Sequence, residues 1–266
     1  MFPLSGDVRR TGFSILAIVS FGLFFVFVSY GGAPTKEIRV LASDGVKAPV
    51  EDLRPQCERA VGHPLAVEFD TAAALKSSIE AGKPFDVAIL TSEAINALVT
   101  EGKIAGGRRT DVARAGIGIG FRAGASKPDI STPDALKQTL LRARSITMNK
   151  NGASATYVEK VFSRLGITEQ IKPKLMLEQE AGRPQMNVAD GKAELVITLI
   201  PEIPVFRGVE LAGPLPAALQ SYIGFTAGIA SDSQDPKGAE ALVKFLSGPE
   251  AAATFKARGL EPRHIN

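Results

Sequence analysis

The sequence contains few of the residues that bind metals or carry thiol chemistry. Its 266 residues include one cysteine and two histidines. Cys57 has no partner for an intrachain disulfide, and its place in an apolar helical pattern indicates a buried structural thiol rather than a nucleophile. His63 and His264 lie far apart along the chain, which leaves too few ligands for a zinc site or a Cys–His pair. We therefore expect neither a metal nor a cofactor.

An excess of charge of one sign is also missing. The 31 basic and 28 acidic residues give a formal net charge of +3 and are spread along the chain. Nucleic-acid binding proteins usually concentrate basic residues on one face or tail, so we expect no nucleic-acid partner. Apolar residues make up 45% and charged residues 22%, which is typical of a globular protein with a substantial core.

Several catalytic arrangements are absent as well. The glycines of residues 115–124 lack the G-x-G-x-x-G spacing and no helical pattern follows them, which argues against a dinucleotide site. Ser43 and Ser154 have no histidine placed to activate them. Asp44, Asp70 and Asp86 fall on three different predicted elements, so a facing pair of catalytic carboxylates is not indicated. We do not expect an enzyme.

The N-terminal residues have a different character. Arg9 and Arg10 precede an apolar stretch that ends near Tyr30, and small residues follow it. This order is typical of an export signal, which we assign to residues 1–35. The stretch also approaches membrane-spanning length, so an uncleaved signal anchor is an alternative. In both cases the remaining chain would function outside the cytoplasm, in the periplasm.

The rest of the chain alternates short apolar runs with helical patterns, which predicts an α/β fold. Strands are predicted at residues 38–43, 65–69, 85–90, 115–124, 145–149, 194–200 and 221–230. Helices are predicted at about 47–61, 71–81, 92–101, 133–143, 236–247 and 249–258, and another, preceded by a loop, within residues 150–167 that ends at Gly166.

Three segments carry a resemblance to a known family. They read "VLASDGVKAPVEDL" from residue 40, "IEAGKPFDVAILTS" from residue 79 and "KFLSGPEAAATFKARGL" from residue 244. In this order they resemble periplasmic solute-binding proteins of the molybdate-binding type, which serve ABC importers, and the likeness covers about residues 38–260. The resemblance implies a two-lobed type II periplasmic-binding-protein fold with a ligand cleft between the lobes and two crossover strands as the hinge. Lobe one would comprise residues 36–114 and 224–266, and lobe two residues 115–223. The resemblance also implies that the protein is a monomer and that it docks on a membrane permease.

The turns between strands and helices are the predicted ligand site. Free backbone N–H groups at the start of a helix lie at the positive end of its dipole and bind small anions. The resemblance and the polar residues at these turns point to eight ligand-binding residues. They are Ser43, Asp44 and Gly45 in the first turn, Thr71 in the second, Asn151 and Ser154 in lobe two, Arg183, and Thr198. Asp44 leaves two readings open, because its carboxylate could cap its own helix or face the cleft.

These predictions give one main function and two alternatives. The resemblance implies a binding protein that delivers a small anion, a molybdate-like oxyanion, to an ABC transporter. Serine donors of that family correspond here to Gly45 and to the Thr71-Ala72-Ala73 stretch, so the same fold binding a small organic carboxylate is an alternative. A membrane-anchored sensory or interaction domain is a second alternative, which the N-terminal apolar stretch would permit.

Overall fold

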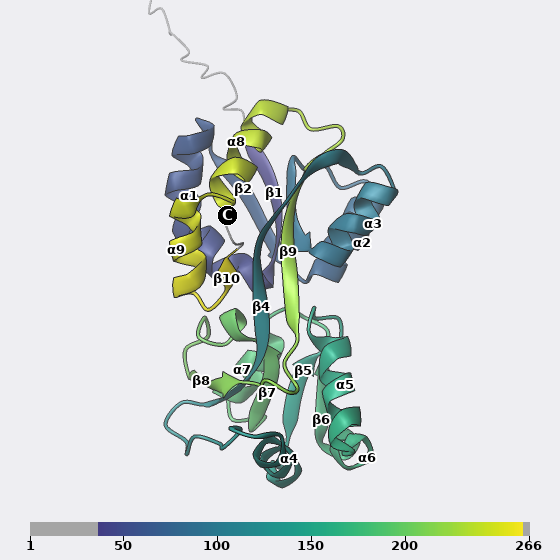
Figure 1. The fold of residues 1–266 in the computed structure, drawn as a ribbon, viewed down its shortest axis with the longest axis vertical. Helices are drawn as coiled ribbons and strands as arrows, with labels where there is room; N and C mark the ends of the chain where they lie inside the picture. The colour runs from purple at the N-terminus through teal and green to yellow at the C-terminus, as the bar shows by residue number, and fades with distance from the viewer. Residues whose placement is uncertain (1–36, 263–266) are drawn as a thin grey trace, which may run out of the picture. The chain divides into compact units, whose positions relative to one another are not determined.

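The computed structural model describes residues 37–262 (Figure 1). The predicted signal segment at residues 1–35 and His264 lie outside the described residues. Within residues 37–262, no helix is both long enough and apolar enough to cross a membrane.

The described chain alternates strands and helices. Its helices are α1 (Lys47–Val61), α2 (Ala72–Glu80), α3 (Ser92–Thr100), α4 (Pro133–Arg142), α5 (Ala155–Leu165), α6 (Thr168–Ile171), α7 (Arg183–Ala189), α8 (Pro236–Leu246) and α9 (Pro249–Ala257). Short 3-10 turns are η1 (Asp44–Val46), η2 (Lys172–Lys174) and η3 (Ile200–Glu202). Its strands are β1 (Ile38–Ser43), β2 (Leu65–Asp70), β3 (Val87–Thr91), β4 (Ile104–Arg122), β5 (Ile146–Asn149), β6 (Leu175–Glu178), β7 (Leu195–Leu199), β8 (Val209–Pro214), β9 (Tyr222–Ala230) and β10 (Glu261–Pro262).

The strands pair into a mixed sheet, which confirms the predicted α/β class. The main order is β2-β1-β3-β9-β4-β7-β5-β6, with β8 and β10 paired to β4. In one part of the sheet β1 runs parallel to β2 and β3, and in the other part β5 runs parallel to β6 and β7. The parallel strands of each part therefore end on a common edge, where their following turns collect.

Strands β4 and β9 lie side by side over eight registered pairs and join the two parts of the sheet (Figure 1). The sequence predicted the first of these strands only at residues 115–124, whereas β4 already begins at Ile104. Residues 106–109 of β4 are exposed and polar or glycine, so they show no apolar alternation that could mark a strand. The predicted lobe boundaries fall within β4 and β9, and they stay a prediction.

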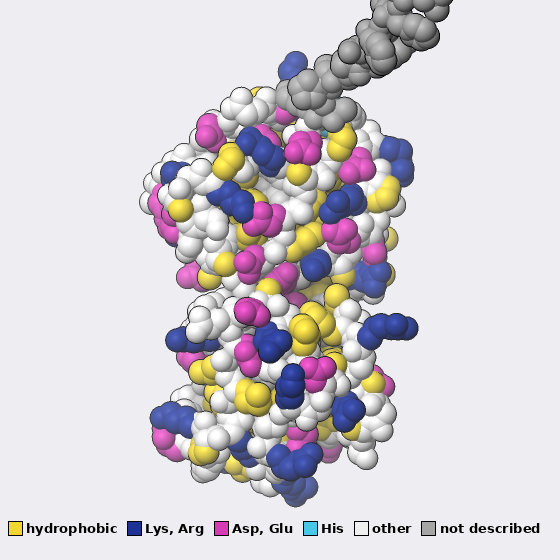
Figure 2. Space-filling model, turned by 180° about the vertical axis from the view of Figure 1, so that it is seen from behind, with side chains coloured by type: hydrophobic (Ala, Val, Ile, Leu, Met, Phe, Trp, Pro, Cys, Tyr) yellow, Lys and Arg dark blue, Asp and Glu magenta, His cyan; other side chains and the backbone are white. Residues whose placement is uncertain are grey.

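Helices cover both faces of the part of the sheet that contains β1 and β3. On one face α2 and α3 bury Leu75, Ile79, Ile95 and Leu98. On the other face α1, α8 and α9 pack against the sheet (Figure 1). Each of these helices buries one apolar stripe, which is how an amphipathic helix gains most of its stability in a protein. Figure 2 shows acidic and basic side chains interspersed on the face opposite to that drawn in Figure 1.

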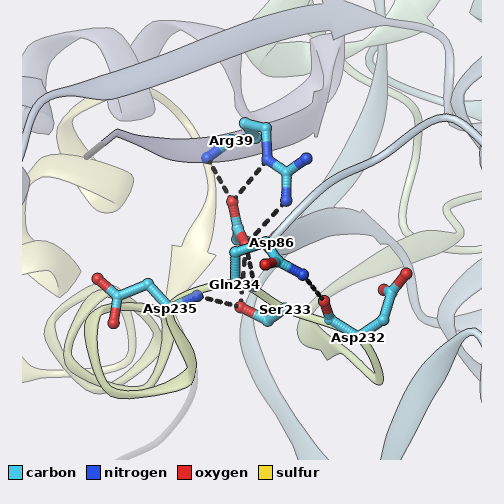
Figure 3. Close-up of polar contacts among 6 residues, drawn as sticks. All are labelled: Arg39, Asp86, Asp232, Ser233, Gln234 and Asp235. Atoms are coloured by element: carbon cyan, nitrogen blue, oxygen red, sulfur yellow. Dashed lines mark hydrogen bonds and ion pairs between the residues drawn. The ribbon is translucent and has the colours of Figure 1, made fainter. Parts of the chain in front are cut away.

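One buried carboxylate ties β1 to the loop before α8. Asp86, 1% exposed, accepts hydrogen bonds from the Arg39 backbone N–H at 3.0 Å and from its guanidinium at 2.9 and 3.2 Å. The Ser233 hydroxyl and the Gln234 backbone N–H also donate to it, both at 3.0 Å (Figure 3). Burial alone would raise the pKa of this carboxyl, but these donors outweigh it and lower the pKa to about 2. Asp86 is therefore ionised at neutral pH and holds two segments of the chain together.

Candidate functional site

A cavity of about 260 Å³ lies beyond the carboxyl ends of the parallel strands β1, β2, β5 and β7. Ligands of open α/β sheets bind at this edge, because helix starts and strand-to-helix turns gather there. Its lining residues are Ser43, Asp44, Lys47, Phe69, Thr71, Ala72, Asn149, Gly152, Ala153, Ala181, Gly182, Pro184, Gln185, Thr198, Glu202, Val205 and Phe206.

The turn after β1 contributes Ser43, Asp44 and Lys47. Ser43 is a buried hydroxyl at the end of the strand. Asp44 begins η1, lines the cavity and makes no side-chain hydrogen bond or ion pair with residues 37–262, so it is not a helix cap. Burial raises the pKa of the Asp44 carboxyl, and the nearby Lys47 partly opposes that rise. Gly45 does not line this cavity among the described residues, since it packs under Phe225 and Leu199.

The turn after β2 contributes Thr71. Its hydroxyl oxygen accepts a hydrogen bond from the Ala74 backbone N–H at 3.2 Å and so caps α2. The hydroxyl proton remains able to donate, so the capping and ligand readings of Thr71 are compatible. Phe69 forms an apolar wall, and the Lys47 ammonium lies 5.5 Å from its ring centroid.

The turn after β5 places Asn149 in the cavity but neither of the predicted residues Asn151 and Ser154. Asn149 lines it, while the Asn149 amide donates to the Glu180 carbonyl at 2.9 Å and accepts from the Asn151 backbone N–H at 2.8 Å. Asn151 lines an adjoining cavity of about 560 Å³ that shares Ala72, Gly152 and Ala153 with the first. Ser154 is buried and lines neither of these two cavities.

Helix α7 contributes Gln185, which the sequence did not single out. Gln185 is 3% exposed, and its Oε1 atom has no hydrogen-bond partner within residues 37–262. The predicted Arg183 begins the same helix but does not line the cavity in the described part of the chain, although Gly182 and Pro184 on either side of it do.

The turn after β7 contributes Thr198 and a second carboxyl, Glu202, which the sequence also missed. The buried Thr198 hydroxyl donates to Glu202 Oε2. Burial raises the pKa of Glu202 to about 7 against the opposing effects of Thr198 and the Leu199 backbone N–H, and the charge of Asp44 raises it further. The cavity thus holds two carboxyls, one of which exchanges its proton near neutral pH. Within residues 37–262, no cluster of His, Cys, Asp and Glu is suited to hold a metal ion.

Comparisons of this sequence with known proteins identify the family to which it is similar. A family model described as bacterial extracellular solute-binding protein matches residues 38–261. A protein named aconitate isomerase from Pseudomonas sp is 30% identical over 237 residues, which cover 86% of this chain and 89% of that protein. The molybdate-binding protein ModA of Azotobacter vinelandii is 27% identical over 254 residues, which cover 91% of this chain and 98% of that protein.

Solved structures share the fold. The periplasmic molybdate-binding protein of Azotobacter vinelandii superposes with a TM-score of 0.71 at 19% identity, covering 84% of this chain and 98% of that chain. The sulfate-binding protein SubI of Mycobacterium tuberculosis gives a TM-score of 0.68 at 18% identity, covering 86% and 88%.

Proposed function

The chain belongs to the bacterial extracellular solute-binding protein family, and on that premise we propose that it binds a small organic acid in the periplasm and delivers it to an ABC importer. The cavity beyond β1, β2, β5 and β7 is the binding site, and a membrane permease is the partner. Residues 1–35 act as the export signal or anchor, and the protein works as a monomer. No catalysis is needed for this role.

The apolar wall of the cavity carries the choice of an organic acid. Asp44 and Glu202 oppose the binding of any anion, organic or inorganic, so their charges do not distinguish the two classes. Phe69, Val205 and Phe206 provide apolar wall that a carbon skeleton can contact and a tetrahedral oxyanion cannot use. Ser43, Thr71 and Lys47 supply donors for carboxylate groups. A molybdate-like oxyanion is the alternative, supported by the ModA relative.

A thermal-shift screen tests this function. Malate, succinate, citrate, tricarballylate, molybdate, tungstate, sulfate and phosphate are added to the purified protein at low salt. A ligand at about 100 times its Kd stabilises the folded state by about 2.7 kcal/mol, which should raise Tm by roughly 5–10 °C. Ser43→Ala should weaken the response, while Ser126→Ala, an exposed serine outside the cavity, should not. A response to molybdate or another oxyanion alone would favour the alternative, and no response to any acid or oxyanion of the screen would contradict both.

Glu202 favours a second candidate function, isomerisation of such an acid. A carboxyl with a pKa of about 7 is suited to take a proton from carbon and return it, because general acid–base catalysts work best near the ambient pH. The 30% identical relative is named aconitate isomerase. Incubation with cis- and trans-aconitate, followed by NMR, tests this function. Turnover that Glu202→Gln abolishes and Glu210→Gln retains would support it, because Glu210 is exposed on β8 outside the cavity. Binding without interconversion would leave only the transport role.

A further inference from the structure

The binding cavity adjoins a larger one, and the two share part of their wall. We call the cavity of about 260 Å³ the first cavity and the one of about 560 Å³ the second cavity. Ala72, Gly152 and Ala153 line both. None of these three residues has a side-chain atom beyond Cβ, so none carries a long side chain that could separate the two cavities. A ligand can therefore extend from the first cavity into the second.

The second cavity contains a cation that the chain leaves without a counter-charge. Two lysines and one glutamate line it. The Lys76 ammonium is already neutralised, because it pairs with Glu80 and, at 3.1 Å, with Glu101. Lys160 makes no ion pair with residues 37–262. Its ammonium lies 5.4 Å from the centroid of the Tyr157 ring, one turn earlier on α5, and this attraction limits the positions that the ammonium adopts.

The glutamate of the second cavity comes from a different element. Glu93 stands in the first turn of α3, which lies on the same side of β4 and β9 as α5 (Figure 1). Within the described part of the chain, Glu93 pairs neither with Lys160 nor with another cation. Its negative charge should therefore weaken the binding of an anion in this cavity, whereas Lys160 should strengthen it.

We propose that the ligand carries a second carboxylate, which Lys160 binds in the second cavity while the donors of the first cavity hold the other one. This inference rests on the proposed function, because it narrows the organic acid to one with at least two carboxylates. The bound carboxylate supplies the counter-charge that Lys160 lacks, through a charge-assisted hydrogen bond. An ion pair inside a cavity is screened less by water than one on the open surface, so it contributes more to affinity.

Diacids and their monoamides test the inference. Succinate and succinamate have nearly the same size, as do glutarate and glutaramate, but in each pair a neutral amide replaces one carboxylate. Calorimetry should show that the wild type binds the diacid about tenfold more tightly or better. Lys160→Gln should bring the two Kd values to within about threefold, chiefly by weakening the diacid. Lys127→Gln should retain the tenfold preference, because Lys127 is exposed and lines neither cavity.

Glu93→Gln distinguishes binding of the ligand by Lys160 from an ion pair between the two side chains. If Lys160 binds the ligand, removal of the Glu93 charge should leave the diacid bound at least as tightly as in the wild type. Weaker binding of the diacid by Glu93→Gln would mean that Lys160 acts through Glu93, which overturns the inference. Lys160→Gln should melt within about 3 °C of the wild type without ligand, since Lys160 is exposed.

The thermal-shift screen separates failure of this inference from failure of the proposed function. Kd is measured in the wild type and in Lys160→Gln for every acid that the screen identifies. An acid that binds equally well to both proteins would overturn the inference and leave the proposed function intact. If no acid of the screen or of the two pairs binds, the proposed function fails and the inference falls with it.

Discussion

Ligand affinity should depend on pH through Glu202. Its pKa of about 7 lies above the ordinary 4.5, and the ionised form adds a second negative charge beside Asp44. An anionic ligand should therefore bind the protonated form, whose share falls from about nine tenths at pH 6 to about one tenth at pH 8. Affinity scales with that share, so Kd should rise roughly tenfold over this interval. Glu202→Gln mimics the protonated form and should bind at pH 8 about as tightly as the wild type binds at pH 6.

The same group should also change stability with pH. A carboxyl with a raised pKa supports folding below its unfolded value of about 4.5, and that support is lost as the pH rises through about 7. Above pH 7 Glu202→Gln should therefore raise the free energy of unfolding, by up to about 3 kcal/mol.

Isothermal calorimetry with malate at pH 6, 7 and 8 measures the first effect, because malate is fully ionised over most of this range, and urea unfolding at pH 5 and pH 8 measures the second. Glu210→Gln is the matched control for loss of an exposed carboxylate. A wild-type Kd that stays constant from pH 6 to pH 8, together with no gain in stability in Glu202→Gln, would refute the reasoning.

Three further predictions concern other parts of the chain. Asp86→Asn should lower the free energy of unfolding at pH 7 by about 2 kcal/mol. The lowered pKa of Asp86 supports folding above pH 4, and that support is lost as the pH falls through about 2. Equal urea midpoints of the variant and the wild type at pH 7 would argue against this. Cys57 should not react with a thiol reagent at pH 8 until urea unfolds the protein, because burial raises its pKa to about 12, and rapid modification of the folded protein would contradict this. Gly45→Ala should lower the free energy of unfolding by about 1–3 kcal/mol, since the added Cβ would lie 2.4 Å from Phe225 Cζ. An unchanged urea midpoint would show that the Phe225 ring moves aside without cost.

The sequence predicts the elements with strong apolar periodicity and misses those that lack it. Residues 38–43 and 47–61 were predicted as they occur in β1 and α1, because apolar spacing and a terminal Gly62 mark them. The first half of β4 was missed, since its pairing with β9 uses backbone groups and leaves its side chains largely exposed.

Some residues of the cavity were likewise predicted from the sequence and others were missed. Ser43, Asp44, Thr71 and Thr198 stand at strand ends, where the resemblance and the turn chemistry direct attention, and all four line the cavity. Gln185 and Glu202 were missed for a physical reason. Their importance comes from burial and from missing or opposing partners, which depend on segments distant in the chain. Gly45, Asn151, Ser154 and Arg183 do not line this cavity within the described residues, and the ligand roles of all eight residues stay predictions.

The close contact between Gly45 and Phe225 ties two positions that are 180 residues apart in the chain. Gly45 lies in the turn that carries Asp44, and Phe225 is a fully buried ring on β9, one of the strands that join the two parts of the sheet. A larger residue at position 45 avoids this clash only if the side chain at position 225 becomes smaller or moves. Among related chains, these two positions should therefore vary together, with a serine or alanine at 45 accompanied by a smaller side chain at 225. The sizes of these two side chains therefore set the distance between the turn after β1 and strand β9.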